Sequence, residues 1–527
     1  MRSRPIIAMN TIFLLVYLPI KGDSHLKTLQ KPIFRDLPQG ECAGAPILQK
    51  LWDRFDFSFL LTQAGIYKVS GVPTWMLSFL YVIGLVAQCS SVSKMAKLAG
   101  KDALLNVMFR RIKITQYTLS RFLTTAYNWS LFGQKRVERL QEEQDTKLQE
   151  GDSINLDDTQ VVHPYGKMLS FLCWLYDHSL KIHVWGMNLV VLQAVLRNGI
   201  EYPLSYLIWQ KPEVKGEGPT KYDLAREMLL QLRKSVTCRL WIAMDRWYLC
   251  KEFFNFLTDN SFDWVTKAKR NTALYRKEIE SWSGRERYVP VNPIMLIKEV
   301  FFQLKTLGKP GIASASIPNI YIKMPYETVN KKGKKVIKQR YTPIAAVVAI
   351  RLKEDEKEYE EKIISDDPTT EQPVKYRGAY LIISNRFDVP KEALSVYIKR
   401  WRIEVFFRAA KQELGMNNCH STTEIHHHAH LELLFAAETL VSYAQWQANQ
   451  EKTSDEEGFT HGEMVHSLFH TRCEIQLKTH KGIQQVCVNF DIPVQKFQRL
   501  FDLFWPDEVR MFLGISFTGS QLLPLSA

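Results

Sequence analysis

The sequence lacks the features that mark several common classes of protein. No two of its eight cysteines have the CxxC spacing of a structural zinc site, and no internal repeat or long low-complexity segment occurs. Most of the cysteines lie in or beside apolar segments, which favours buried, reduced thiols in a cytosolic protein. We therefore expect neither a zinc module built on cysteine pairs nor a repeat array.

Long apolar runs are also scarce. Residues 6–20 are largely apolar after a basic start, as in a signal peptide, but Asn10 interrupts the run and no A-x-A cleavage site follows. A spurious upstream start or a buried helix explains this segment better than secretion does. A second apolar stretch, residues 75–87, is shorter than a membrane span requires. We expect no transmembrane helix, no membrane partner and a cytoplasmic location.

What the sequence does contain is typical of a large, basic globular protein. Hydrophobic residues make up 46% of the 527 residues and charged residues 24%, which provides ample material for a core. A chain of this length suggests two to four structural units. The formal charge is +14, from 69 basic against 55 acidic residues. This excess suits a polyanionic partner, although many soluble proteins are mildly basic.

The first part of the chain predicts helices. Residues 1–45 are interpreted as an N-terminal extension, and apolar residues recur at helical spacing through residues 46–150. Residues 90–100 predict a short helix with serine caps and a terminal glycine, and residues 115–127 predict a further helix. Two alternatives stay open: a DNA-reading helix-turn-helix and an ordinary helical bundle, which we slightly favour.

The pattern changes at about residue 151, and residues 151–415 predict a sheet with helices on its faces. Three strands come first, and helices then alternate with strands. This is the element order of an α/β ribonuclease-H-like catalytic core. Asp157 and Asp158 end the first predicted strand, and Asp245 follows the fourth. The predicted elements are strands at 153–158, 183–196 and 202–209, a helix at 223–236, a strand at 238–244, a helix at 248–257 and a strand at 263–269.

A β-rich insertion is predicted at about residues 289–378. Residues 320–329 and 336–352 are strand-like, and they flank a basic glycine turn that suits a hairpin. The lysines of this turn, Lys331–Lys335, either touch DNA or form a solvated tip, and the sequence favours neither reading.

The C-terminal region, residues 416–527, is predicted to be mainly helical. It contains a histidine cluster, within which His426 and His430 have the spacing of paired helical metal ligands. No HExxH glutamate or nearby cysteine pair accompanies them. We therefore favour a packed or solvated start of a helix over a metal site. The cluster consists of His426, His427, His428 and His430.

The strongest chemical pattern lies on a predicted helix at about residues 391–414. Its apolar residues point one way, and five polar or ionisable side chains share an arc of roughly 80° on an ideal helix: Tyr397, Arg400, Glu404, Arg408 and Lys411. A solvated helix with the ion pairs Arg400–Glu404 and Glu404–Arg408 is the simpler explanation. The strand-end aspartates weaken it, because two strand ends and a helix would then supply carboxylates to one site. Such a site suits two Mg²⁺ ions, with the cations holding DNA phosphates beside it.

These residues resemble a known family. Tyr397, Arg400, Glu404 and Lys411, separated by two, three and six residues, match the YREK signature of DDE transposases from bacterial cut-and-paste insertion sequences (insertion sequence family four and its relatives). The fragment Leu156–Thr159 is similar to the family's first-aspartate motif, D-x-T. The fragment 242–245 is similar to its second-aspartate motif. The resemblance covers about residues 153–440, and the YREK match is its specific part.

The resemblance implies a fold, an activity and partners. Asp157, Asp245 and Glu404 would be catalytic and would bind two Mg²⁺ ions, for which Mn²⁺ can substitute. Asp158 remains an alternative first ligand, although the D-x-T register favours Asp157. The implied partners are double-stranded DNA, as transposon ends and target, and a second subunit in a homodimer. The implied β-rich insertion falls between Asp245 and Glu404, where composition also places one, and the source would be bacterial or archaeal. The implied DNA-binding residues are Tyr397, Arg400 and Lys411, and helix geometry adds Arg408.

One departure from the family keeps other functions open. The family usually has a small residue two places after the second aspartate, whereas Arg246 and Trp247 follow Asp245 here. A bulky pair at that point would reshape the site or lower its activity. The alternatives are a catalytically inactive, transposase-derived DNA-binding protein and a ribonuclease-H-like DNA endonuclease without strand transfer.

Overall fold

The structure is a computed structural model, and it describes most of the chain. The described residues are 12–17, 39–40, 42 and 44–489, apart from 111, 165, 167–168, 178–179, 213, 215–216, 281–283, 306–310, 330–333, 353–377, 451–456, 470–471 and 479–482. Everything said below about structure concerns these residues.

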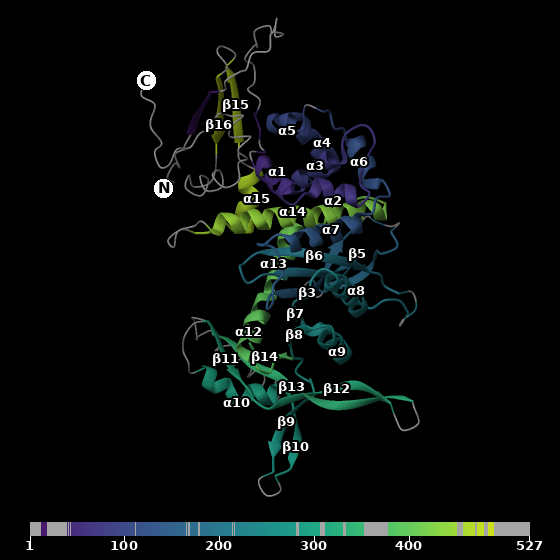
Figure 1. The fold of residues 1–527 in the computed structure, drawn as a ribbon, viewed down its shortest axis with the longest axis vertical. Coiled ribbons are helices and arrows are strands. Elements are labelled where there is room, and N and C mark those ends of the chain that lie inside the picture. Colours follow the sequence, from purple (N-terminus) through teal and green to yellow (C-terminus); the bar gives the residue numbers. More distant parts are fainter. Residues whose placement is uncertain are drawn as a thin grey trace.

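A mixed sheet of twelve strands forms the centre of the molecule (Figure 1). Strands β3, β5 and β6 pair antiparallel, whereas β7 pairs parallel with both β3 and β8. This mixed α/β sheet confirms the fold class at the level of sheet and helices. The strands of this half are β3 Ser153–Val162, β4 Cys173–Asp177, β5 Ile182–Val195, β6 Glu201–Trp209, β7 Leu240–Met244 and β8 Phe262–Lys267.

Two points of this half differ from the sequence prediction. Strand β4 was not predicted, and β3 continues to Val162, so Asp157 and Asp158 lie inside the strand rather than at its end. The reason is that the two neighbours of β3 have different lengths. The parallel pairing with β7 stops at Leu156, whereas the antiparallel pairing with β5 continues to Val162. The two aspartates therefore mark the end of the parallel pairing only.

Helices cover both faces of the sheet. Helices α8 (Lys221–Arg233) and α9 (Lys251–Asp259) lie on one face, and α12 (Pro390–Lys399) and α13 (Trp401–Gln412) lie on the other. Helix α8 begins with a capping box, in which the side chains of Thr220 and Asp223 each accept a hydrogen bond from the other's backbone N–H.

The predicted insertion is continuous with the central sheet. Strand β14 pairs with β8 on one side and β13 on the other, and β12 and β9 extend the sheet further. The strand predictions at 320–329 and 336–352 are confirmed. The extra strands begin earlier than predicted, and helix α10 was missed. The elements are β9 Leu274–Ile279, β10 Glu286–Val291, α10 Pro293–Lys305, β11 Gly311–Ser316, β12 Ile320–Val329, β13 Lys335–Leu352 and β14 Ala379–Ser384.

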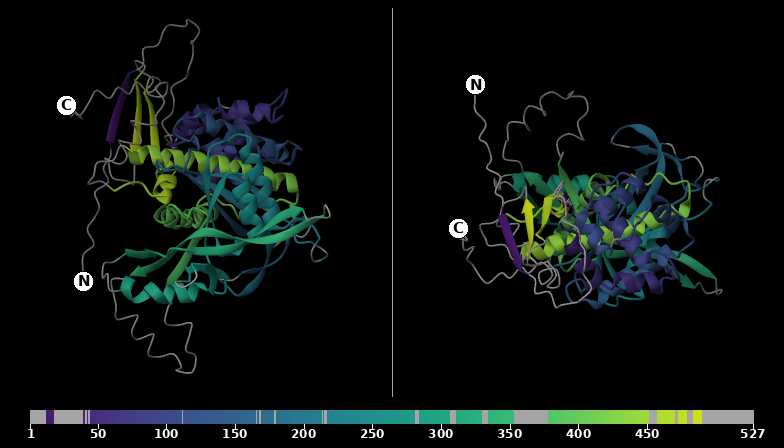
Figure 2. Two further views of the ribbon diagram at one scale, coloured as in Figure 1. Left: turned by 60° about the horizontal axis from the view of Figure 1, so that its bottom comes forward. Right: turned by 90° about the horizontal axis from the view of Figure 1, so that it is seen from above.

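A helical layer lies beside the sheet and joins two distant parts of the sequence (Figures 1 and 2). The long helix α14 contacts α1, α3, α6 and α7 as well as β6. The fully buried Arg136 of α7 connects them, because it donates to the backbone oxygens of Pro203 and Leu204 and to the Thr439 hydroxyl of α14. The helices are α1 Ala45–Arg54, α2 Phe57–Gln63, α3 Thr74–Val86, α4 Val92–Lys101, α5 Ala103–Met108, α6 Gln116–Thr124, α7 Trp129–Glu142, α14 Glu424–Gln450 and α15 His461–Phe469.

The helices predicted at 90–100 and 115–127 are present as α4 and α6. The Ser91 side chain caps α4 by accepting from the Lys94 backbone N–H. Helix α5 lies between them in the chain, and α4 contacts α3, α5 and α6. These contacts favour the helical-bundle interpretation over a minimal helix-turn-helix. No helix within the described ranges is long and apolar enough to cross a membrane.

The C-terminal region, which the sequence predicts to be mainly helical, also contains strands. Strands β15 (Arg472–Lys478) and β16 (Ile483–Asn489) form an antiparallel hairpin. Strand β1 (Ile12–Tyr17) pairs with β16, so this part of the apolar N-terminal segment is a strand rather than a buried helix. The short β2 (Gln39–Gly40) pairs with β15. The strict alternation of polar and apolar residues in β15 was the signal that the helical prediction overlooked.

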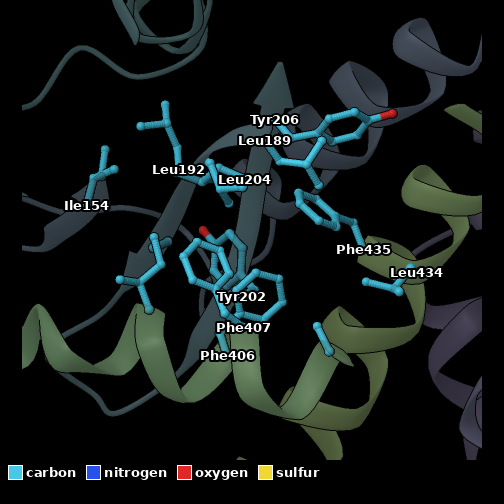
Figure 3. Packing of buried hydrophobic residues seen from close by; sticks show 14 of the residues in the cluster. Ile154, Leu189, Leu192, Tyr202, Leu204, Tyr206, Phe406, Phe407, Leu434 and Phe435 are labelled. Carbon is cyan, nitrogen blue, oxygen red and sulfur yellow. The ribbon is translucent and has the colours of Figure 1, made fainter. Parts of the chain in front are cut away.

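The apolar face of α13 anchors that helix to the rest of the molecule. Phe406 and Phe407 of α13 gather with Phe435 of α14 and Tyr206 of β6 (Figure 3). The rings of Phe406 and Phe435 meet edge to face at 5.8 Å, and those of Tyr206 and Phe435 at 5.3 Å. This packing fixes which side of α13 turns toward the end of the parallel strands.

Candidate active site

Three neighbouring parallel strands present ionisable residues in one row. Leu156 of β3 pairs in register with Met244 of β7, and Met244 pairs with Thr266 of β8. The next position along each strand is therefore Asp157, Asp245 and Lys267. Neighbouring strands lie about 4.8 Å apart, and in-register side chains of parallel strands share a face. The fold thus places two carboxylates and an ammonium group side by side.

Asp157 and Asp158 face opposite sides of the sheet, as strand alternation predicts. The Asp158 carboxylate accepts from Lys221 Nζ at 2.7 Å and from Asn188 Nδ2 at 2.9 Å, on the side of α8. Asp157 instead accepts from Arg400 Nη1 at 3.0 Å, on the side of α12 and α13. The structure brings Asp157 to Asp245 and turns Asp158 to the opposite face of the sheet.

The predicted helix at 391–414 is broken at Arg400. Helices α12 and α13 meet there, and the Arg400 backbone N–H donates to Tyr397 O in a tight turn. The Arg400 side chain then reaches two carboxylates, because its second terminal nitrogen donates to Glu404 Oε1 at 2.6 Å. The expected Arg400–Glu404 ion pair is present. The expected Glu404–Arg408 pair does not form within the described residues, and Arg408 is exposed.

The buried setting raises the pKa of two groups in the cluster. Burial, opposed by the Arg400 charge, raises the pKa of Asp157 to about 7, and the nearby Asp158 and Asp245 charges add to the rise. Burial also raises the pKa of Tyr397 to about 12, although the Arg400 charge opposes the rise. The Arg400 guanidinium carbon lies 5.8 Å from the centre of the Tyr397 ring. Tyr397, Arg400, Asp157 and Asp245 therefore interact electrostatically as one cluster.

Lys411 lies two turns beyond Glu404 and outside this cluster. Burial lowers the pKa of its ammonium group, and the nearest opposing charge is Asp177 of β4. Of the predicted DNA-binding residues, Tyr397 and Arg400 thus touch the carboxylate cluster, whereas Arg408 and Lys411 extend along α13 away from it. They would meet a phosphate backbone at a different point.

Lys267 belongs to the site, although its part was not predicted. Burial lowers its pKa to about 8, and the neighbouring Arg246 charge adds to the decrease. Its ammonium nitrogen lies 3.2 Å from the centre of the Tyr380 ring of β14, a cation–π contact. The signal in the sequence was its place at the end of the strand beside Asp245. That place becomes meaningful only when the sheet register is known.

Arg246 and Trp247, which depart from the family pattern, do not fill the space beside Asp157 and Asp245. These residues form the short turn η1 (Arg246–Tyr248), and the Trp247 ring stacks on Tyr222 of α8 at 5.0 Å and 17°. The Tyr222 hydroxyl donates to Trp247 O at 2.9 Å. Trp247 is therefore held against α8, and Arg246 adds a cation near Lys267. The bulky pair is accommodated beside the carboxylates.

An ion-pair network around one buried carboxylate, Asp263, lies before the start of α12. Asp263, at the start of β8, is 2% exposed and accepts from Arg239 at 2.6 Å and from Arg386 at 2.9 Å. Arg386 also pairs with Asp388, two residues before Pro390 at the start of α12. Because Tyr397 lies on α12 and Arg400 directly follows that helix, this network helps to set their height above the strand ends.

The donor set suits hard divalent cations, but its three carboxylates do not converge. Within the part of the chain that the structure describes, no group of three histidine, cysteine, aspartate or glutamate side chains is close enough to hold a metal ion. Arg400 lies between Asp157 and Glu404 and neutralises both. Carboxylate oxygens are the ligands that Mg²⁺ prefers. Asp157 and Asp245 are adjacent, and among the described residues Glu404 forms its ion pair with Arg400 alone.

The histidine cluster packs the start of α14. His430 Nδ1 lies 2.9 Å from the Tyr81 hydroxyl, and His428 Nδ1 lies 3.1 Å from the Tyr206 hydroxyl. His427 Nε2 lies 2.9 Å from the Ser421 backbone oxygen. These contacts join α14 to α3 and β6, and they confirm the packed helix start that the sequence favours over a metal site.

Comparison with known proteins points to one class of enzyme. Residues 213–440, less than half of the chain, match the family described as "Transposase DDE domain". The matched stretch contains Asp245, Arg400 and Glu404, and Asp157 lies before it. No curated protein matches the sequence. Among solved structures, a piggyBac transposase synaptic complex with hairpin DNA is similar at 9% identity over 82% of both chains, with a TM-score of 0.39. A likeness this low establishes nothing further, whereas the family match supports a DDE transposase.

Proposed function

We propose that the protein is a transposase that binds transposon ends and catalyses Mg²⁺-dependent DNA strand cleavage and strand transfer, as cut-and-paste transposition requires. The observation that carries the proposal is the placement of Asp157 and Asp245 side by side, with Glu404 connected to Asp157 through Arg400. The match of residues 213–440 to a transposase domain supports it. The YREK spacing supports the further proposal that it is an insertion sequence transposase of bacteria or archaea, which would act on DNA in the cytoplasm.

Asp157, Asp245 and Glu404 are the residues that would hold two Mg²⁺ ions, or Mn²⁺ in their place. Bound ions supply Lewis acidity, which activates a hydroxyl nucleophile and stabilises charge on the phosphate oxygens. Arg400 pairs with both Asp157 and Glu404 in this structure. When the carboxylates bind metal, Arg400 would release one of them and bind a DNA phosphate instead. Tyr397 and Lys267 border the same space and would orient that phosphate. Arg408 and Lys411 would hold the backbone farther along α13.

The decisive experiment replaces Glu404 by glutamine and measures cleavage of a duplex that carries the element's own end. The duplex comes from the DNA flanking the gene. We expect cleavage with Mg²⁺ by the native chain and none by Glu404→Gln, because an amide cannot replace a carboxylate ligand. Glu392→Gln is the matched control, since Glu392 lies on α12 and pairs with the exposed Arg197. Full cleavage by Glu404→Gln would overturn the assignment.

A joining assay separates the proposal from a simple endonuclease. Pre-cleaved ends are mixed with target DNA and Mg²⁺, and joined products are counted. Pairing two ends requires two active sites, so we propose a homodimer in the DNA complex, which light scattering of that complex would detect. An inactive DNA-binding protein would bind the ends equally well with and without the three carboxylates and would cut in neither Mg²⁺ nor Mn²⁺.

A further inference from the structure

Strands β12 and β13 leave the central sheet and continue as a two-stranded ribbon (Figure 1). Strand β9 pairs with β12 only at Ile320 and Tyr321, and β14 pairs with β13 only from Ala345 onward. Between these points the two strands pair only with each other among the described residues. Met324 is still buried at 4% exposure, whereas Tyr326 is 36% exposed. From Tyr326 outward, the ribbon therefore stands clear of the body.

The ribbon is strongly cationic. Its described residues, 326–329 and 334–340, include four lysines and arginines against the single acidic Glu327. Glu327 pairs with Lys335 at 3.3 Å, and both lie on one face of the ribbon. Among the described residues, Lys338 and Arg340 form no ion pair, and both are exposed.

One face of the ribbon collects these unpaired charges. Tyr326 is opposite Lys338 in the antiparallel register, and Met324 is opposite Arg340. Alternation along each strand places their side chains on the same face, away from Glu327. The Arg340 guanidinium carbon lies 5.8 Å from the centre of the Tyr326 ring. This face thus offers two cations around an aromatic ring, and no carboxylate.

We propose that the β12–β13 ribbon enters the major groove of duplex DNA and holds it through its phosphates without regard to sequence. A major groove about 12 Å wide admits a two-stranded ribbon, whose strands lie about 4.8 Å apart. Lys338 and Arg340 complement the phosphates that border the groove. The inference deepens the proposed function and rests on it, because it gives the same enzyme a second hold on its DNA, apart from the carboxylate cluster.

The test measures binding of the full chain to a random-sequence duplex without divalent metal, by fluorescence anisotropy over a range of salt concentrations. The slope of log K against log salt is negative, and each lost phosphate contact reduces its magnitude by about 0.9. For the double variant Lys338→Gln/Arg340→Gln we expect a slope smaller by about 1.8 and at least about tenfold weaker binding that is equal across sequences. The control double variant is Lys147→Gln/Lys234→Gln, which removes two exposed lysines elsewhere and should bind as the native chain does.

A second experiment tests whether the ribbon binds in the major groove. A duplex whose major groove is filled by glucosylated hydroxymethylcytosine should bind the native chain as weakly as plain DNA binds the double variant. Equal slopes for native chain and variant, or no effect of the filled groove, would overturn the ribbon proposal. Exposed lysines would then serve only to prevent edge-to-edge aggregation.

The two proposals fail in different ways. Loss of cleavage in Glu404→Gln with unchanged binding by the ribbon variant would remove the ribbon proposal alone. Ribbon-dependent binding by a chain that never cuts DNA would remove the proposed enzymatic function alone.

Discussion

Two regions of the molecule bury ionisable side chains, and they differ in the groups that surround those side chains. At the end of the parallel strands, Asp157 and Asp245 lie beside each other, and burial works against the charge of Asp157. At the start of α14, burial lowers the pKa of the histidines, and His427, His428 and His430 lie within hydrogen-bond distance of a backbone oxygen and two tyrosine hydroxyls. Neutral buried groups with partners add to the fold, whereas like charges placed together cost stability. This difference is consistent with the proposed function, in which the strand ends form the active site.

The largest effect on cleavage is expected from the variant that removes the Asp157 carboxylate. Asp157→Asn should lower cleavage by at least about a thousandfold, as loss of an essential catalytic group does. The same change should leave the free energy of unfolding equal to or above that of the native chain, because it removes a buried charge. Cleavage rates and urea unfolding of one preparation measure both.

The neighbouring aspartate is the matched control for that variant. Asp158→Asn leaves Lys221 without its partner on the other face. It should cost about 1–3 kcal/mol of stability while cleavage falls far less than in Asp157→Asn. Equal losses of cleavage in the two variants would erase the distinction between the faces.

The buried histidines allow a prediction of how the stability of the protein changes in acid. Burial lowers the pKa of His163 and His426 to about 4 and that of His430 to about 3. Unfolded histidine titrates near 6.5, so below that pH the unfolded chain binds protons that the folded chain does not. Stability should therefore fall from about pH 6.5 toward pH 4, by at most about 1.4 kcal/mol per pH unit for each histidine.

Urea unfolding at several pH values measures this loss. His163→Gln should flatten the pH dependence, and the exposed His183→Gln should not. His461 acts in the opposite sense. Glu438 and Glu413 raise its pKa to about 10 against the effect of burial, so its contribution is complete below about pH 6.5 and declines as the pH rises toward 10. A stability that is flat between pH 4 and pH 7 would contradict neutral burial of the histidines.

The smallest expected effect on cleavage is that of replacing Lys267, which lies in one row with Asp157 and Asp245. Lys267→Ala should lower the cleavage rate by about tenfold, which corresponds to about 1.4 kcal/mol, because a phosphate would lose one positive neighbour. The variant should bind Mg²⁺ at least as well as the native chain, since it removes a like charge from beside the carboxylates. Isothermal titration with Mg²⁺ and single-turnover cleavage measure the two effects. Weaker Mg²⁺ binding would show that Lys267 supports the site in another way.

Local patterns predicted much of the fold and of the site. Alternation within β3 correctly separated Asp157 from Asp158, and helical periodicity placed α4, α6 and α8 within a few residues. The spacing of Arg400 and Glu404 predicted their ion pair, which the structure contains.

Other features depend on contacts that the sequence does not display. The break at Arg400 has no proline or glycine to mark it. It arises because α12 packs on β7, β8, β13 and β14, whereas α13 packs on β3. The role of Lys267 likewise depends on the register of three strands that are far apart in the chain.

The packing of α14 has a consequence for how the protein is made. Helix α3 is apolar on almost all sides and completes its burial against α14, which leaves the ribosome several hundred residues later. At about 5–20 residues per second, this delay amounts to tens of seconds. During that time a nascent chain carries an uncovered apolar helix, so its yield in a cell should depend on chaperone supply. Slower translation between residues 142 and 424 should send more of the product into aggregates.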